Sequence, residues 1–301
     1  MATGLQTSSD IAAVISTVLS PAREVIEKPT ILSEMFSEFT LEDGDGTTVN
    51  WPKFPYQLTA QGLTEGTPLN NPQKLIPTSQ QFTTSEVGIQ VMQTDKSIRV
   101  TPEKMRARAG RMMGNAMKRK MELDRLGLFA GLSRALGSGA GNAFNPSLIS
   151  VARVRLLTAA EAGQTEAAPG EIYAVIHPFH YHDTLVSAAN LGSNINSDSG
   201  YAPIQGLTEQ IIREYDIKML YNVPIVQHAL MEIDSSDDAV GAVFSKEAFL
   251  FIKTSNMMKN ETERDPSLRA YSTWMTSEYG VGEIEDQWGF KIVADATAPT
   301  S

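Results

Sequence analysis

The stretch that decides the fold is residues 83–100, Thr83-Thr84-Ser85-Glu86-Val87-Gly88-Ile89-Gln90-Val91-Met92-Gln93-Thr94-Asp95-Lys96-Ser97-Ile98-Arg99-Val100. Val87, Ile89 and Val91 alternate with polar residues, and apolar residues at every second position are typical of a strand with one buried face. The residues from Thr47 to Phe54 alternate in the same way. We therefore expect a strand over residues 47–54 and one long strand, or two, over residues 83–100.

The 28 residues between these strands are rich in Gly, Pro, Asn and Thr, and they include Pro55, Pro68, Pro72 and Pro77. Prolines at this density make a helix unlikely to form, because each removes a backbone donor and clashes with the preceding turn. A loop of this length inside a compact domain is uncommon unless it works outside that domain. An isolated two-stranded ribbon is barely stable in water. We expect a projecting hairpin that lies on another surface, which a neighbouring subunit can supply.

A long helix is expected to follow the hairpin. Thr101-Pro102-Glu103 supplies an N-cap, a proline at the first helical position and an acid in the first turn,. The helix should run to about Leu136, before the glycine-rich residues 137–141. An apolar stripe expected to face the core comprises Met105, Ala109, Met112, Ala116, Leu123, Leu126 and Ala130,. A basic stripe comprises Lys104, Arg108, Arg111, Lys118 and Arg125, and it is either a solvated face, an interface or a surface turned toward packaged nucleic acid.

The remainder of the chain reads as alternating helices and strands. Helical spacing or capping signals predict helices over residues 8–27, 148–162, 178–189 and 209–215, and apolar runs predict strands over 171–176, 217–221 and 224–227,. The elements from residue 148 to residue 227 are expected to form an α/β subdomain. Residues 240–252 are expected to form a strand pair around Ser245-Lys246-Glu247. A closing pair is expected over 269–279 and 288–295, with Gly280 and Gly282 near its turn.

Composition excludes several functional classes. The 301 residues include no cysteine, which excludes disulfides, thiolate nucleophiles and cysteine-bound metals. No apolar run approaches the roughly 20 residues that span a bilayer, so we expect no membrane partner. The net charge of −10 argues against a general nucleic-acid binder,. Residues 99–136 nevertheless carry ten basic and three acidic side chains. Such unlike charges suit either self-association or a match within one monomer.

The one crowded group of titratable residues is His177, His180, His182 and Asp183. Imidazoles and a carboxylate can bind zinc, but the spacing is not HExxH, and His177 can equally cap the helix that Pro178 opens. The three histidines are therefore weak metal candidates. The sequence has no GxSxG, no phosphate-binding Gly-Lys-Ser/Thr and no GxGxxG,. We expect no catalytic residues, no cofactor and no enzyme.

The order of parts resembles the major capsid protein of tailed bacteriophages, which has the Hong Kong 97-type fold. The stretches that carry the resemblance run from Leu63-Thr64-Glu65-Gly66-Thr67-Pro68 to Val100, and from Ala239-Val240-Gly241-Ala242-Val243-Phe244 to Asp295. The resemblance implies an α+β fold with an N-terminal arm (1–43), an extended β-hairpin or E-loop (44–100), a P-domain with a long spine helix (101–168), an α/β A-domain (169–239), and P-domain strands with the C-terminus (240–301).

The function that the resemblance implies is self-assembly, in the host cytoplasm, into the hexamers and pentamers of an icosahedral or prolate virion capsid that encloses double-stranded DNA. Only about 40 residues precede the hairpin, so we expect a separate scaffold protein, besides a portal and a cement protein. Some relatives cross-link a lysine to an asparagine; here we expect non-covalent clamping. The intersubunit contacts expected from the E-loop are Leu63, Glu65, Leu69, Lys74, Leu75, Ile76 and Phe82. Two alternatives stay open, an encapsulin-type compartment shell and a soluble metal-dependent hydrolase.

Overall fold

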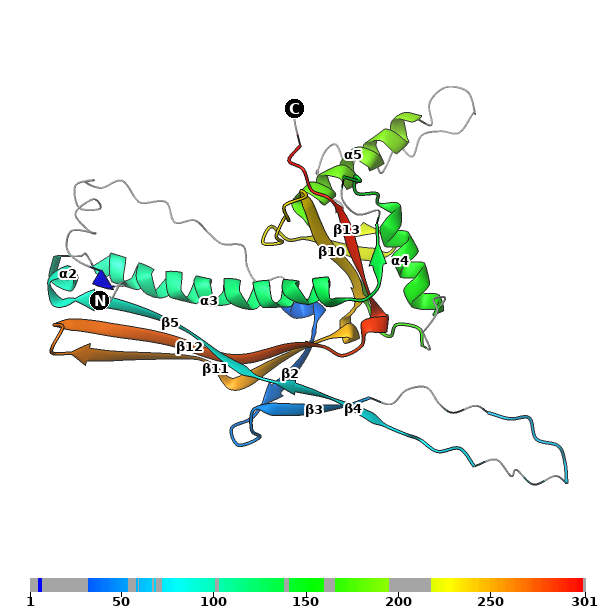
Figure 1. Ribbon diagram of the computed structural model, residues 1–301, viewed down its shortest axis with the longest axis horizontal. Coiled ribbons are helices and arrows are strands. Elements are labelled where there is room, and N and C mark those ends of the chain that lie inside the picture. The colour runs from blue at the N-terminus through cyan, green and yellow to red at the C-terminus, as the bar shows by residue number, and fades with distance from the viewer. Residues whose placement is uncertain are drawn as a thin grey trace.

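The computed structural model describes residues 5–6, 32–53, 58, 60–66, 68, 72–100, 103–137, 141–159, 166–194 and 218–299. It consists of two mixed sheets, a two-stranded hairpin and a small number of helices (Figure 1). The helices expected over residues 8–27 and 209–215 lie outside the described residues.

The five-stranded sheet has the order β1 (Leu5–Gln6), β5 (Ser85–Thr94), β12 (Ala270–Glu283), β11 (Phe249–Asp265) and β2 (Ser37–Leu41). The expected strand over 83–100 is confirmed only as far as Thr94. Residues 95–100 form the helix α2 (Asp95–Val100) instead. The Thr94 hydroxyl oxygen accepts a hydrogen bond from the backbone N–H of Ser97 at 3.2 Å. This bond caps the helix and ends the strand.

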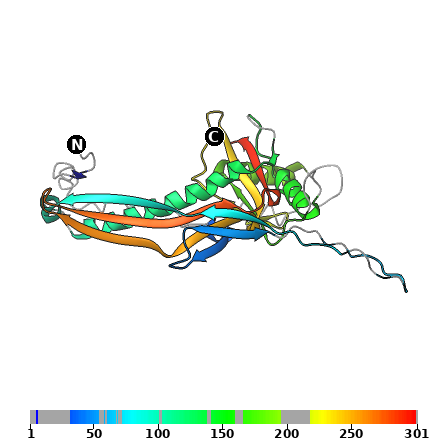
Figure 2. The same cartoon turned by 60° about the horizontal axis from the view of Figure 1, so that its bottom comes forward.

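The long helix is α3 (Glu103–Gly131), which lies along one face of the five-stranded sheet (Figures 1 and 2). Its 29 residues span about 43 Å,. It ends five residues before the expected Leu136, because Ala135–Leu136 form the short strand β6, which pairs with β13 (Gly289–Asp295). The expected apolar stripe is confirmed at Leu126, which is buried, but it was wrong at Met112, Ala116 and Ala130, which are exposed. The buried methionines are Met113, Met117 and Met121, whereas Met112 is 60% exposed, so the buried face is turned by about 100° from the expected one.

The six-stranded sheet stands beyond the C-terminal end of α3. Its order is β6, β13, β10 (Asp238–Ser245), β7 (Ile172–Ile176), β9 (Val223–Gln227) and β8 (Met219–Leu220). The helices α4 (Ser147–Thr158) and α5 (Pro178–Asn194) cover one face through the buried residues Ile149, Leu156, Tyr181 and Leu185. The opposite face packs on the C-terminal half of α3. The α/β arrangement expected for this region is therefore confirmed.

The strands expected near the C-terminus are confirmed, but their expected pairing was wrong. β10 pairs with β7 and β13, whereas β11 pairs with β12 and β2. The short 3-10 helix Lys246–Ala248 carries the chain from one sheet to the other, so neighbours in sequence belong to different sheets. Residues 240–301 consequently supply strands to both sheets.

A projecting hairpin forms as expected, but its second strand was wrong: the partner of β3 comes from the expected loop, and β5 joins the five-stranded sheet instead. β3 (Thr48–Lys53) and β4 (Thr78–Thr83) pair antiparallel, with Thr48 opposite Thr83 and Lys53 opposite Thr78. Val49 and Phe82 pack with Leu250 and Ile252 of β11, on the side of the sheet away from α3. The residues between β3 and β4 that the structure describes extend away from the body (Figures 1 and 2).

Gly280 and Gly282 lie inside β12, not near a turn as expected. They stand where the hairpin crosses the sheet. A Cβ at position 280 would lie 3.0 Å from the carbonyl oxygen of Thr83, and a Cβ at position 282 would overlap the Phe82 ring. Glycine at these positions therefore lets the hairpin lie directly on the strand.

We predict that Gly282→Ala lowers the free energy of unfolding of the unassembled chain by roughly 1–3 kcal/mol, because the added methyl group displaces Phe82 from a packed site. Gly110→Ala on α3 is the matched control. No atom lies within 4 Å of the added Cβ there, so helix propensity should raise stability by roughly 0.5–1 kcal/mol. Urea denaturation measures both values. Equal effects of the two substitutions would contradict the close packing of Phe82.

Candidate assembly surfaces

The hairpin presents several large apolar side chains that are more than half exposed. Leu63 is 75% exposed, and Leu75 and Ile76 are more than half exposed. Glu65 and Lys74 are also exposed, and the expected contact Leu69 lies outside the described residues. Large aliphatic side chains grouped on one projecting element are typical of a surface that is buried in an assembly.

Phe82 differs from the other expected hairpin contacts. It is only 7% exposed, because it lies between β4 and β12 in the cluster with Leu250 and Ile252. The expectation that Phe82 contacts a neighbouring subunit was therefore wrong. It fixes the root of the hairpin to its own sheet.

The residues of the predicted basic stripe on α3 differ in their exposure to solvent. Arg111 and Lys118 are exposed. The backbone positions of Lys104 and Arg108 lie in α3, and their side chains are outside the described residues. Arg125 is only 2% exposed, so its assignment to an interface or to the inner surface of a shell was wrong.

Arg125 belongs to a buried charged group that sequence reasoning missed. Its Nη1 donates to Glu122 Oε1 at 2.7 Å, and its guanidinium carbon lies 3.9 Å from the centre of the Phe251 ring. The other oxygen of Glu122 lies 3.1 Å from His228 Nε2. His228 Nδ1 accepts the backbone N–H of Leu230, so Nε2 carries the proton and donates to Glu122. Burial lowers the pKa of Arg125, and Glu122 opposes this shift.

This group connects α3 to the six-stranded sheet. Glu122 and Arg125 are one turn apart on the helix, and His228 follows β9 directly. The i, i+3 spacing of Glu122 and Arg125 was visible in the sequence as an ordinary surface pair. Only the tertiary structure shows that both side chains are enclosed.

Two of the three candidate metal ligands, His177 and His180, make hydrogen bonds, and the third, His182, has its Nδ1 3.8 Å from Asp183 Oδ1. His177 Nδ1 accepts the N–H of Phe179 at 3.2 Å, which confirms the helix-cap alternative. His180 stacks on Phe144 and lies 3.0 Å from the carbonyl oxygen of Ala294 through Nε2. Burial lowers the pKa of both His177 and His180. Within the described residues, no three His, Cys, Asp or Glu side chains are placed to hold a metal ion.

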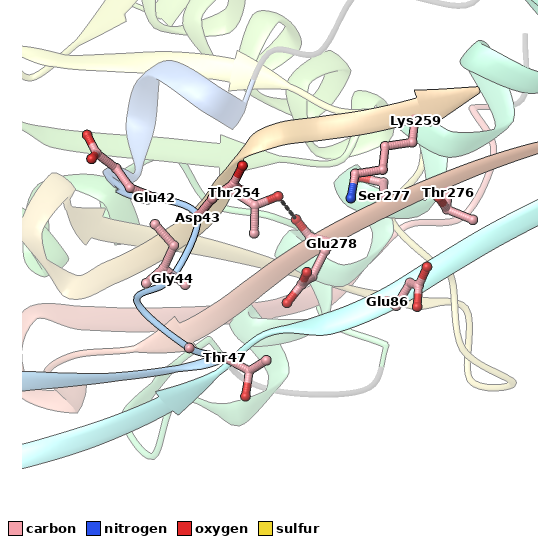
Figure 3. A pocket seen from close by; sticks show the side chains of 12 residues that line it. Glu42, Asp43, Gly44, Thr47, Glu86, Thr254, Lys259, Thr276, Ser277 and Glu278 are labelled. Carbon is pink, nitrogen blue, oxygen red and sulfur yellow. Dashed lines mark hydrogen bonds between the residues drawn. The ribbon is translucent and has the colours of Figure 1, made fainter. Parts of the chain in front are cut away.

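A cavity of about 380 Å³ lies beside the root of the hairpin (Figure 3). Its charged lining consists of Glu42, Asp43, Glu86, Glu278 and Lys259. The Thr84 hydroxyl donates to Glu278 Oε1 at 2.6 Å, and the Thr254 hydroxyl donates to the backbone oxygen of Glu278 at 3.2 Å. Four carboxylates against one ammonium group make this cavity suited to cationic groups.

A second junction ties the hairpin to the end of α3. Lys53 of β3 forms an ion pair with Glu285, and Gln80 of β4 donates to the carbonyl oxygen of Glu283 at 2.7 Å. Asp286 accepts the backbone N–H of Ser133, just after α3, at 2.7 Å. Burial and the neighbouring Asp286 raise the pKa of Glu283 to about 7.

Comparisons with known proteins agree with this architecture. The head structure of Helicobacter pylori bacteriophage KHP40 matches with a TM-score of 0.68 and 11% identity, over 93% of this chain and 94% of that chain. The capsid of Ralstonia phage GP4 matches at 0.66 and 15%, over 89% and 88%, and that of Cyanophage P-SCSP1u at 0.64 and 15%, over 94% and 95%. No protein-family model and no curated protein matches the sequence. The chain therefore has a phage capsid fold, as the resemblance implied.

We predict that Arg125→Ala lowers the free energy of unfolding by roughly 3–5 kcal/mol, because the buried Glu122 carboxylate loses its cationic partner and keeps only the hydrogen bond to His228,. Lys118→Ala removes an exposed charge from the same predicted stripe and should change stability by less than about 0.5 kcal/mol. Thermal and urea denaturation of the unassembled chain test both values. Similar small effects would show that Arg125 is not enclosed.

A further prediction concerns the pH dependence of stability. Glu283 has a raised pKa of about 7 against an ordinary value of 4.5, so the folded chain binds more protons than the unfolded chain between these values. The contribution of Glu283 to stability therefore falls as pH rises from about 4.5 to 7. Glu283→Gln should remove this fall and raise stability above pH 7.

Urea denaturation as a function of pH measures this effect. Glu263→Gln, at an exposed position of β11, should keep the original pH profile. An unchanged profile in Glu283→Gln would contradict the assignment.

Proposed function

We propose that this chain is the major capsid protein of a tailed bacteriophage. Copies assemble into hexamers and pentamers, and these close an icosahedral or prolate shell around double-stranded DNA. The observation that carries the proposal is a projecting hairpin with exposed Leu63, Leu75 and Ile76 on a body with a phage capsid fold. The chain then acts as a structural protein, not an enzyme, and its place is the virion capsid.

The finer division follows the Hong Kong 97-type arrangement. The hairpin corresponds to the E-loop, and α3 with the five-stranded sheet corresponds to the spine helix and P-domain. The six-stranded sheet with α4 and α5 corresponds to the A-domain. Because β10 and β13 pair within that sheet, we assign them to the A-domain, although the sequence boundary at residue 239 placed most of these residues in the P-domain.

In this proposal the hairpin supplies the adhesive contact. Its exposed apolar side chains become buried on an adjacent subunit, with Glu65 and Lys74 at the polar margin. Each contact is weak, but a closed shell forms many of them simultaneously. Weak single contacts also let misplaced subunits leave before closure.

The exposed basic residues of α3 are proposed to meet either a neighbouring subunit or DNA. Arg111 and Lys118 are exposed, and Lys104 and Arg108 earlier in the helix join this proposal by their sequence positions alone. The net charge of −10 opposes nonspecific adhesion of DNA to the remaining wall. Separate scaffold, portal and cement proteins complete the proposed partners.

We predict that purified chain forms hollow particles of megadalton mass and that the double substitution Leu75→Asp/Ile76→Asp prevents their formation. Carboxylates at these positions cannot be buried against an apolar surface without a large desolvation penalty. Light scattering and negative-stain electron microscopy, with scaffold protein supplied, measure assembly. The unassembled double variant should keep its urea midpoint, because both residues are exposed.

Leu75→Met/Ile76→Leu is the matched control and should assemble normally. A chain that stays monomeric under all salt conditions with scaffold present would overturn the proposal. Particles that hold a stoichiometric enzyme and no nuclease-protected DNA would favour the encapsulin-type compartment instead.

A further inference from the structure

The helix α3 has two apolar faces, and only one of them is buried. Met117 and Met121 belong to the buried cluster between the two sheets, whereas Met112 is 60% exposed. A helix that only covers its own sheets needs one apolar face, so the second face indicates a further contact. Its members recur at helical spacing over about five turns and are the exposed Met112, Ala116, Gly127 and Ala130 with the half-buried Leu123.

Basic side chains lie along both margins of this exposed face. At about 100° per residue, Arg119 lies about 20° to one side of it and Lys120 about 20° to the other, and both are exposed. Arg111 and Lys118 are exposed farther round on the side of Arg119. The carboxylate of Asp124 lies beyond Lys120 and accepts from its Nζ at 2.6 Å. The face is therefore apolar along its centre and positively charged along its margins.

Small residues let another helix come close to this face. Ala116 and Ala130 carry only a methyl group, and a Cβ at position 127 would meet no atom within 4 Å. The distance between two packed helices depends on the side chains at their contact, so small residues beside Met112 and Leu123 favour close packing. The face is about 27 Å long, which matches one side of a single helix of ordinary length.

The positive margins require an acidic helix, and the longer described helices of this chain do not supply one. A second copy of α3 would present the same positive margins. The charged residues of α4 are Arg153 and Arg155, and Asp183 is the only carboxylate in α5. The helix that the sequence predicts over residues 8–27 carries Asp10 as its only charged side chain before Pro21. A separate protein therefore fits the face better than a second copy does.

The apolar centre of the face favours a protein helix over DNA. Binding to DNA rests on neutralising its phosphates, and phosphates offer no surface that could cover Met112 and Leu123. An amphipathic helix covers such residues with its own apolar side and places its charged residues at the margins.

We propose that the exposed face of α3 is a docking site for an acidic amphipathic helix of a separate protein. The apolar side of that helix covers Met112, Ala116 and Leu123, and its carboxylates pair with Arg119 and Lys120. A contact of one helix is small and therefore weak, so the partner can leave again. This inference rests on the proposed function, in which the partner acts as the scaffold protein.

A synthetic probe tests the site. The probe is a dye-labelled helix of about 20 residues with leucines along one side and glutamates on both margins, and fluorescence anisotropy measures its binding to the unassembled full chain. We expect a Kd on the order of 10 μM. A probe with lysines in place of the glutamates should bind at least about tenfold more weakly, because its charges repel the margins.

Substitutions on α3 locate the contact. Met112→Glu and Arg119→Glu should each weaken binding about tenfold or more, because the first places a carboxylate in the apolar centre and the second repels the glutamates of the probe. Met112→Leu should stay within about threefold of the original chain. Lys96→Glu makes the same charge change at an exposed position of α2 and should have little effect. Unchanged urea midpoints show that each variant is folded.

Cysteine cross-linking identifies the occupant, because the chain has no cysteine of its own. Ala116→Cys should form a disulfide with a probe that carries a central cysteine, and Ser267→Cys on the turn after β11 should not. If Ala116→Cys instead cross-links to Val14→Cys in the absence of the probe, the N-terminal segment of the chain occupies the face and the inference is overturned.

The remaining outcomes separate this inference from the proposed function. If the probe does not bind, or if Met112→Glu and Arg119→Glu bind it as well as the original chain does, the docking site is overturned and the capsid function stands. Double-stranded DNA of about 20 base pairs that binds more tightly than the probe, and that Arg119→Glu no longer binds, overturns the inference in favour of a nucleic-acid surface. Failure of the original chain to assemble overturns the proposed function and the scaffold role, whereas the probe measurements use unassembled chain.

Discussion

Four phenylalanines hold the two sheets together, and the remaining architecture depends on this contact. Phe244 is the last residue but one of β10 in the six-stranded sheet, and Phe249 begins β11 in the five-stranded sheet, with ring centres 5.0 Å apart. Phe129 from α3 and Phe36 from the segment before β2 pack on both, at ring distances of 5.1 to 5.8 Å. All four are buried. Because Lys246–Ala248 alone separates β10 from β11, the sheets cannot move apart without opening this cluster.

The buried charged group of Glu122, Arg125 and His228 fixes the relative orientation of the elements that the phenylalanines hold together. Apolar packing tolerates small rotations, whereas the bonds from Glu122 to Arg125 and His228 require defined positions,. His228 lies just past β9, so its hydrogen bond with Glu122 fixes the orientation of the six-stranded sheet relative to α3. Replacement of such a group by apolar residues can leave stability unchanged. Its contribution here is therefore orientation, which matters for a subunit that must present separate contact surfaces at set angles.

Local patterns in the sequence were sufficient to predict the helices and strands whose buried residues recur at a regular spacing. The alternation of Val87, Ile89 and Val91 predicted β5, and capping signals predicted α4 and α5. The pairing of the late strands could not be read locally, since β10 and β11 adjoin in sequence but belong to different sheets. The face of α3 was also ambiguous, because Met112 and Met113 offer equally apolar alternatives. Arg125 and Phe82 were misassigned for the same reason, as only the tertiary structure encloses them.

The hairpin divides into two parts with different physical roles. At its root, Val49 and Phe82 are buried against the chain's own sheet, and Lys53 pairs with Glu285. Farther out, Leu63 and Leu75 remain exposed and find no surface within the described chain. A fixed root sets the direction in which the exposed part reaches, so little orientational freedom remains to be lost when it docks. The net charge of −10 keeps free subunits apart at a distance, whereas the apolar contact acts only when a neighbour lies in register. Long-range repulsion and short-range adhesion together favour ordered closure of a shell over indiscriminate aggregation.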